Sequence, residues 1–126
     1  MEKIKVVLVR ATEESLPTTL TIEDDLKAYQ TLIECDSIDI VRRFIGGKQY
    51  TIVCDDEGLL KEHPIISAVT KDGIVALVGN LVIAGLPNDE GDLTSLTDKD
   101  VKEILREFAI VKHTETGKKY YAVKVW

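Results

Sequence analysis

Cys54 and His63 carry the side chains for nucleophilic chemistry, a thiol and a base that would activate it. A reactive thiol needs an electropositive setting that lowers its pKa, but three acids follow Cys54 directly at positions 55–57. Because those acids are consecutive on a turn, they share one environment, water, and do not form an acid/base pair with separated pKa values. Cys54 also alternates with Ile52 and Tyr50 in a strand-like run, so we expect a packed structural thiol.

Zinc would require histidines and cysteines that converge from distant positions. The chain has two of each, without a C-x-x-C pair or an H-E-x-x-H arrangement. A zinc site would need all four residues in one place, Cys35, Cys54, His63 and His113. Separate core or surface roles explain each of them more simply, and we expect no metal site.

Two other segments that begin like ligand-binding motifs fail at positions that geometry demands. Residues 88–92 begin like a calcium loop, but Leu93 occupies the position of the turn glycine and Lys99 that of the bidentate acid. Residues 46–48 (Gly-Gly-Lys) lack the upstream glycine and the following Ser or Thr of a phosphate-binding loop. Since neither G-x-G-x-x-G nor G-x-S-x-G occurs, we expect no cofactor, no catalytic residue and no enzyme.

An acidic surface is predicted between positions 87 and 100. Five acids there oppose one base, Lys99, which gives this segment a net charge of −4. Such a surface would suit a partner that recognises DNA-like charge. The favoured alternative is that two of the acids belong to a helix cap and the others solvate a loop. The candidate partner-binding residues are Asp89, Glu90, Asp92, Asp98 and Asp100.

A basic surface with interleaved aromatic residues is predicted at the C-terminus. A hairpin of this kind would stack on single-stranded nucleic acid or contact a partner. In the favoured alternative, its lysines protect the edge of a sheet against aggregation. The same hairpin would also pair across a two-fold axis in a homodimer. The candidate residues are Lys112, Lys118, Lys119, Tyr120, Lys124 and Trp126.

Two helices are predicted from start signals followed by apolar residues at helical spacing. Thr21 precedes three acids within residues 22–25 and is expected to cap a helix that runs to position 33, after a loop around Pro17. Thr97 and Asp100 form a second capping-box pattern. The apolar face of the second helix is expected to consist of Val101, Ile104, Leu105 and Phe108.

The strands are predicted from short β-branched and apolar runs. Residues 3–10 form one buried strand, and Gly46-Gly47 joins a hairpin made by residues 38–45 and 49–54. Residues 74–84 are apolar around Gly79-Asn80 and form two short strands, or one bent strand, in the sheet interior. Residues 110–113 and 120–125 form a closing hairpin. The fold class is therefore α+β, with a mainly antiparallel sheet of five to seven strands and two helices.

Composition indicates one domain over residues 1–126. The chain has 126 residues, of which 44% are hydrophobic and 30% charged, enough to bury one core. The net charge of −6 makes nucleic acid a poor default partner. Without a secretory signal or a membrane-spanning stretch, and with two cysteines, we expect a soluble protein of the cytoplasm.

Four segments resemble a family of small uncharacterised proteins carried mostly by phages, plasmids and Gram-positive bacteria (domain of unknown function 3846). They are residues 22–33, 38–41, 54–60 and 92–100, and the resemblance covers residues 3–108. Members commonly continue from a Leu-Pro pair to an Asn, whereas here Ile65 and Ile66 follow His63-Pro64. The hairpin over residues 110–126 departs from the family pattern as an extension. The resemblance implies a mobile-element setting and provides no catalytic residues.

The sequence therefore favours a non-enzymatic accessory protein of mobile-element type, monomeric or homodimeric, that binds another protein. The alternative is a small nucleic-acid-binding module that uses the basic aromatic hairpin. No membrane association is expected.

Overall fold

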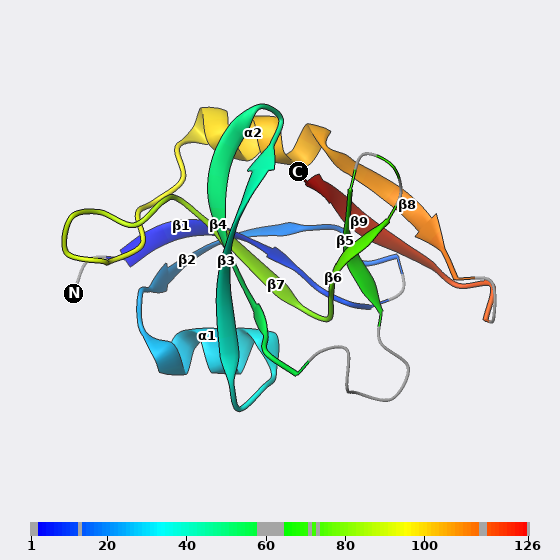
Figure 1. The fold of residues 1–126 in the computed structure, drawn as a ribbon, viewed down its shortest axis with the longest axis horizontal. Coiled ribbons are helices and arrows are strands. Elements are labelled where there is room, and N and C mark those ends of the chain that lie inside the picture. Colours follow the sequence, from blue (N-terminus) through cyan, green and yellow to red (C-terminus); the bar gives the residue numbers. More distant parts are fainter. Residues whose placement is uncertain are drawn as a thin grey trace.

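A computed structural model of the protein describes residues 3–12, 14–57, 65–70, 72, 74–113 and 116–125. These residues form nine strands and two helices, arranged as two β-sheets with one helix at each side of the first sheet (Figure 1). The elements are β1 (Lys3–Val9), β2 (Thr18–Glu23), α1 (Leu26–Ile33), β3 (Ile38–Ile45), β4 (Lys48–Asp55), β5 (Ile66–Thr70), β6 (Val75–Val78), β7 (Leu81–Ala84), α2 (Asp98–Arg106), β8 (Phe108–Lys112) and β9 (Lys119–Val125). The predicted α+β class is confirmed, with more strands than the five to seven expected.

The first sheet has five antiparallel strands in the order β2-β1-β7-β4-β3. All four residues of β7 are buried at its centre. The predicted hairpin of β3 and β4 is confirmed, with Gly46 and Gly47 at φ angles of 62° and 90°. Two positive φ angles in a two-residue loop match the right-handed twist of the flanking strands, and glycine adopts them without steric cost.

The second sheet has four strands in the order β6-β5-β9-β8. The predicted closing hairpin is confirmed as the antiparallel pair β8 and β9. On its other side β9 pairs in parallel with β5, the one parallel pair among the described strands. As a result β9 lies inside this sheet and β8 lies at its edge.

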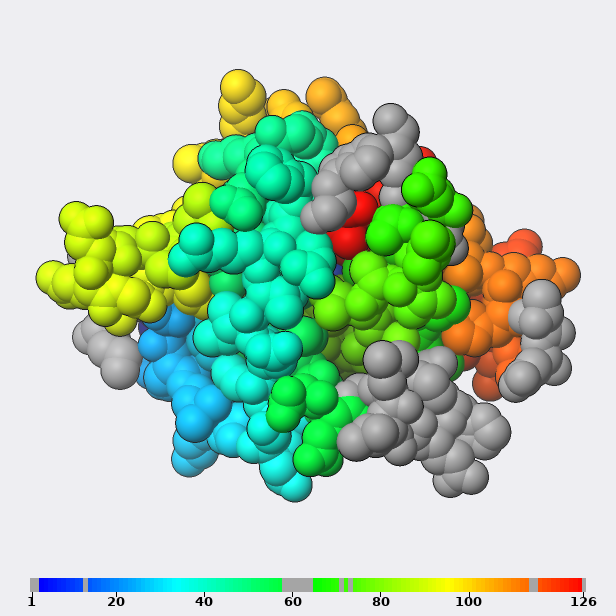
Figure 2. Space-filling view, in the orientation of Figure 1, coloured from blue at the N-terminus to red at the C-terminus, as the bar shows by residue number. Residues whose placement is uncertain are grey.

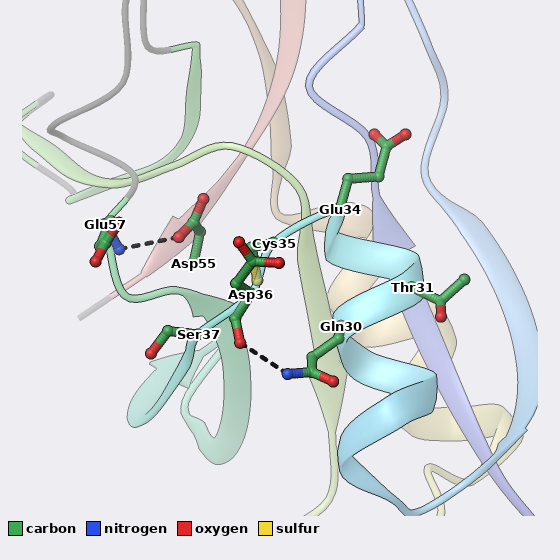
Figure 3. A pocket seen from close by; sticks show the side chains of 8 residues that line it. All are labelled: Gln30, Thr31, Glu34, Cys35, Asp36, Ser37, Asp55 and Glu57. Carbon is green, nitrogen blue, oxygen red and sulfur yellow. Dashed lines mark hydrogen bonds between the residues drawn. The ribbon is translucent and has the colours of Figure 1, made fainter.

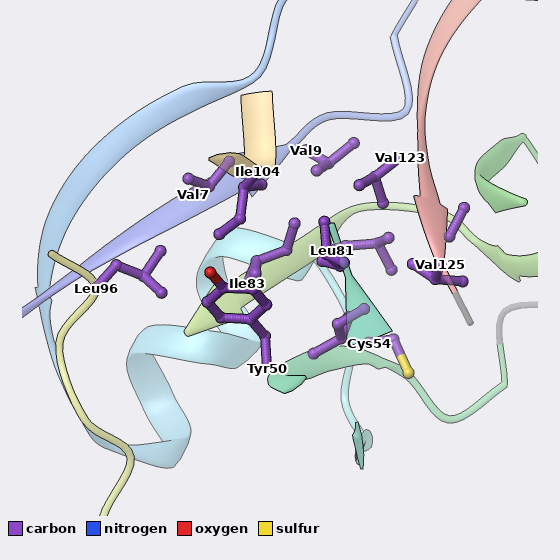
Figure 4. Packing of buried hydrophobic residues seen from close by; sticks show 13 residues of the cluster. Val7, Val9, Tyr50, Cys54, Leu81, Ile83, Leu96, Ile104, Val123 and Val125 are labelled. Carbon is purple, nitrogen blue, oxygen red and sulfur yellow. The ribbon is translucent and has the colours of Figure 1, made fainter. Parts of the chain in front are cut away.

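The main core lies between the two sheets and is closed by α2 (Figure 4). Ile52, Leu81 and Ile83 of the first sheet meet Val123 and Val125 of the second, and all five are buried. A second apolar cluster fills the space between α1 and the other face of the first sheet. Tyr29 and Ile33 are the buried residues that α1 contributes to it.

The predicted cap of the second helix is confirmed. The Thr97 hydroxyl accepts a hydrogen bond from the Asp100 amide, and the Asp100 carboxylate accepts one from the Thr97 amide. The predicted apolar face is wrong beyond Ile104, because Leu105 is 40% exposed and Phe108 already belongs to β8. The helix ends at Arg106, so the period of 3.6 residues does not apply further along the chain.

The predicted start of the first helix is wrong. Thr21 lies in β2, and the helix is capped by Asp25, whose carboxylate accepts from the Ala28 amide at 2.7 Å. The loop predicted around Pro17 is shorter than expected, because Thr18 and Thr19 already belong to β2. Because Leu20 and Ile22 alternate with threonine, β2 pairs with β1 while one of its faces meets the apolar cluster below α1.

The apolar run at 74–84 forms two strands, but the prediction that both lie in the sheet interior is wrong for one of them. β7 is central in the first sheet, whereas β6 is the edge of the second. Gly79 turns the chain between them with a φ of 79°. Asn80 fixes this crossing, because its side chain accepts from the Ala11 amide at 2.7 Å and donates to the Leu32 carbonyl at 3.3 Å.

Candidate binding surface

The Cys54 thiol is a packed core group, as its strand position predicted. The residue is 4% exposed, and its Sγ lies 3.6 Å from the carbonyl oxygen of Asp39. Burial, together with the negative charge of Asp39, raises its pKa to about 11, although Arg43 opposes the shift. His63, the base once considered for it, lies outside the described residues. The thiol is thus neutral at physiological pH.

Cys54 is therefore expected to resist iodoacetamide in the folded protein. At pH 8 a thiol with a pKa of about 11 is ionised to roughly one part in a thousand, and burial blocks access as well. Peptide-resolved mass spectrometry of alkylation, with and without urea, measures this protection. Alkylation of Cys54 at the same rate in both conditions would show that the thiol is accessible and reactive.

Metal ligation finds no support among the parts of the chain that the structure describes. Within those parts, no group of three or more His, Cys, Asp or Glu side chains is placed to hold an ion. In the calcium-like segment, the Asn88 side chain accepts from the amides of Glu90 and Asp92 at 2.9 and 3.0 Å. The amide oxygen of Asn88 thus stabilises the turn of its own loop.

The predicted acidic residues fall into two groups. Asp98 forms an ion pair with Lys5, and Asp100 is buried at the start of α2, so both serve the fold. Asp89, Glu90 and Asp92 are exposed in the loop between β7 and α2. This loop and the basic hairpin lie at opposite ends of the long axis of the molecule (Figure 2).

A polar cleft of about 470 Å³ lies between the C-terminal end of α1 and the C-terminal end of β4 (Figure 3). The two hydrogen bonds drawn in Figure 3 join residues that are close in sequence. Gln30 donates to the Asp36 carbonyl at 2.7 Å, and the Glu57 amide donates to the Asp55 carboxylate at 2.9 Å. No base lies among its described lining residues, so the cleft is unsuited to anions. The acids that line it are Glu34, Asp36, Asp55 and Glu57.

The predicted basic residues surround the hairpin of β8 and β9. The four lysines, at positions 112, 118, 119 and 124, are all exposed. Tyr120 is only 6% exposed, and its ring contacts that of His113 with centroids 4.8 Å apart. Trp126 lies outside the described residues. The hairpin therefore presents charge, while one of the predicted aromatic residues is turned inward.

One face of this hairpin combines charge with exposed apolar side chains. In the register of the two strands, Ile110 lies opposite Tyr121 and Lys112 lies opposite Lys119. These four residues share one face of the hairpin with Val123, which belongs to the main core. Leu16, from the segment before β2, lines a cleft of about 330 Å³ together with Ile110, Lys119 and Tyr121. Leu16 is 64% exposed and Ile110 is 59% exposed. We call this surface the hairpin face; it consists of Leu16, Ile110, Lys112, Lys119 and Tyr121.

Leu16 and Ile110 were not identified from the sequence. Ile110 was assigned to a strand, and alternation along Phe108, Ile110 and Lys112 would have placed it on one face. Whether that face is covered depends on how far the first sheet extends over it. This is a property of the tertiary structure that a local sequence pattern does not predict. Leu16 sits in an irregular segment that gives no periodic signal.

A protein-family model described as Domain of unknown function (DUF3846) matches residues 4–109. No curated protein and no solved structure matches the chain. Among the described residues, no helix is long and apolar enough to cross a membrane.

Proposed function

The chain belongs to the DUF3846 family, and from that premise we propose that it is a non-enzymatic accessory protein that binds another protein through the hairpin face. The proposal includes the mobile-element setting and the cytoplasmic location expected from the sequence.

The observation that carries the proposal is the pairing of Lys112 with Lys119 beside exposed Ile110. Like charges directly opposite each other on two strands destabilise the pair. Large aliphatic side chains grouped on a surface also lose the stabilisation that burial would provide, about 1.5–3 kcal/mol for each side chain. A partner that covers Ile110 and places negative charge near the lysines removes both costs. Exposed apolar groups rimmed by charge are typical of protein-binding surfaces.

A protein partner fits this surface better than nucleic acid does. Stacking on bases needs exposed aromatic rings, but Tyr120 is buried against His113, and among the described residues Tyr121 is the one half-buried aromatic ring on the hairpin face. Aliphatic Leu16 and Ile110 offer nothing to a phosphate backbone. The four exposed lysines of the hairpin keep single-stranded nucleic acid as the second candidate ligand.

Affinity capture from the native host, with and without nuclease, tests the proposal. A Leu16→Ser/Ile110→Ser variant is expected to recover a specific partner protein at least about tenfold less well than the parent chain. The matched control is Leu26→Ser on α1, because Leu26 is 57% exposed and lies away from the hairpin.

Equal recovery by the Leu16→Ser/Ile110→Ser variant and the parent would contradict the proposal. Recovery that disappears with nuclease, and with Lys118→Glu/Lys119→Glu, would instead favour the nucleic-acid candidate. Circular dichroism of each variant verifies that the fold is retained.

A further inference from the structure

The outer edge of β8 presents backbone groups that pair with no other strand among the described residues. The Lys124 amide donates to the Glu107 carbonyl at 2.8 Å, and the His113 amide donates to the Lys118 carbonyl at 2.9 Å. In an antiparallel pair such bonds recur at every second residue, so odd-numbered residues of β8 face β9. The N–H and C=O groups of the even-numbered residues therefore point outward; these residues are Phe108, Ile110 and Lys112.

One edge of the first sheet, β3, is closed by its own side chains. At β3 the outward amide of Ile40 donates to the carboxylate of Asp39 at 2.9 Å. The carbonyl of Arg42 accepts from the guanidinium of Arg43 at 2.8 Å. Side chains that occupy edge groups in this way oppose the addition of another strand.

β6, at the far edge of the second sheet, is only four residues long, and its register with β5 shifts twice. Short and irregular edges also disfavour strand addition. Along β8, in contrast, no side chain of the described residues bonds to the outward groups. Ile110 stands exposed beside them, as Ile40 does at β3 and Val75 at β6.

We propose that β8 accepts an extended segment of a partner protein as an added strand, and that this segment carries an acidic side chain beside Lys112 and an apolar one beside Ile110. The inference rests on the proposed function and specifies how the hairpin face is bound. Main-chain hydrogen bonds supply the affinity of such a complex, and alternate side chains supply the specificity.

Charge selects the chemistry of the added segment. A strand next to β8 places its side chains about 4.5–5.5 Å from their neighbours on the hairpin face. An acid at the position beside Lys112 places a negative charge next to the two positive charges of Lys112 and Lys119. An apolar residue two positions along the same face covers Ile110.

A second copy of β8 meets this requirement poorly. If two β8 strands paired antiparallel about Ile110, each Lys112 would lie beside Phe108 of the other copy. Neither lysine would gain an opposite charge. The added segment therefore belongs to a different, acidic protein.

Synthetic strands provide the probe. The first is a labelled ten-residue peptide in which Glu and Val alternate with Thr, so that Glu and Val share one face. Its two counterparts carry Lys in place of Glu, or N-methyl groups on alternate amides. Fluorescence anisotropy is expected to give dissociation constants at least about tenfold weaker for both counterparts.

Amide exchange followed by NMR locates the bound peptide. With the Glu/Val peptide, exchange of the outward amides of Ile110 and Lys112 is expected to slow at least about tenfold. The amides of Ala109 and Val111, already bonded to β9, serve as internal references. Unchanged exchange at Ile110 and Lys112 in the presence of bound peptide would overturn strand addition.

A pair of substitutions distinguishes the contribution of the Ile110 backbone N–H to binding from that of its side chain. Ile110→Ala and Ile110→Pro both remove the isoleucine, but only proline removes the outward N–H, and no bond to β9 is lost. Ile110→Pro is therefore expected to fold and to bind the Glu/Val peptide at least about tenfold more weakly than Ile110→Ala. Should Ile110→Pro fail to fold, the N-methylated peptide tests the same backbone bonds on the unaltered protein.

The outcomes distinguish this inference from the proposed function. If Leu16→Ser/Ile110→Ser loses the host partner while Ile110→Pro and Ile110→Ala bind the peptide equally, the hairpin face binds a protein by another mode and strand addition is overturned. If none of these variants affects capture or peptide binding, both ideas fail. A dimer in sedimentation equilibrium that Ile110→Pro abolishes and Ile110→Ala retains would assign the edge to a second copy and overturn the acidic partner.

Discussion

Replacing Asp100 with alanine is expected to lower the free energy of unfolding by about 2–4 kcal/mol, because a helix cap and the acceptor of a buried hydroxyl are lost together. The carboxylate of this buried residue accepts hydrogen bonds from Lys48 at 2.7 Å, from the Tyr50 hydroxyl at 3.1 Å and from the Thr97 amide at 2.9 Å. It thereby joins the start of α2 to the start of β4. Without it the Tyr50 hydroxyl, on a residue only 1% exposed, loses its acceptor.

Urea unfolding followed by circular dichroism measures this loss. Asp98→Ala is the matched control, since Asp98 lies in the same helical turn but its side chain is 87% exposed. Its ion pair with Lys5 is solvated, and we expect little change in the urea midpoint. Similar midpoints for the two variants would show that the network around Asp100 contributes no more than a surface pair.

The same carboxylate predicts part of the acid sensitivity of the protein. Burial tends to raise the pKa of Asp100, but the hydrogen bonds from Lys48, Thr97 and Tyr50 outweigh it and lower the pKa to about 2, from 3.8. A depressed pKa means that the unfolded chain binds the proton more readily. The contribution to stability, on the order of 2 kcal/mol, is complete above pH 3.8 and is lost as the pH falls through about 2. Asp100→Asn is expected to remove this dependence from the acid limb of the stability curve.

A chain that ends at Ala109, where the family match ends, is expected not to fold. It would lack β9, which lies between β5 and β8 and is an interior strand of the second sheet. Val123 and Val125, at most 1% exposed, are part of the main core. Burial of each such side chain contributes about 1.5–3 kcal/mol, and the strand ladders on both sides of β9 would be lost too. Because domains of this size have about 5–15 kcal/mol in total, these losses exceed what the remainder can absorb.

NMR chemical-shift dispersion and cooperative thermal unfolding measure that outcome. The control is the 126-residue Lys112→Ala/Lys119→Ala variant, which alters the same hairpin only at exposed positions and is expected to unfold cooperatively, at least as stable as the parent. A truncated chain with dispersed signals and a cooperative transition would show that the hairpin is an appendage of the domain.

Short sequence motifs predicted the local structure correctly where no competing interpretation of the same residues existed. The Gly46-Gly47 pair admits few structures other than a tight hairpin, and Thr97 with Asp100 satisfies both halves of a capping box. Thr21 and Asp25 both resemble helix caps, and the choice between them was made by β1, because pairing with it draws Thr21 into a strand. That contact lies in tertiary structure and cannot be read from the segment itself.

The candidate surface was predicted only in part for a similar reason. The lysines of the C-terminal hairpin were identified by type, and all four are exposed. Their pairing needed the register between β8 and β9, and the exposure of Ile110 needed the extent of the first sheet. Register and coverage are properties of two elements together, so a single periodic segment does not specify them.

The unequal edges of the second sheet bear on the stoichiometry of the proposed complex. Molecules assemble into a continuous sheet only when both edge strands of each molecule can pair with a further strand. Here β6 is short and its register with β5 shifts twice, whereas β8 is the regular edge. Under the proposed strand addition, the second sheet would therefore take one ligand strand, at β8, and the protein would act as a cap on that strand rather than as a link in a fibre.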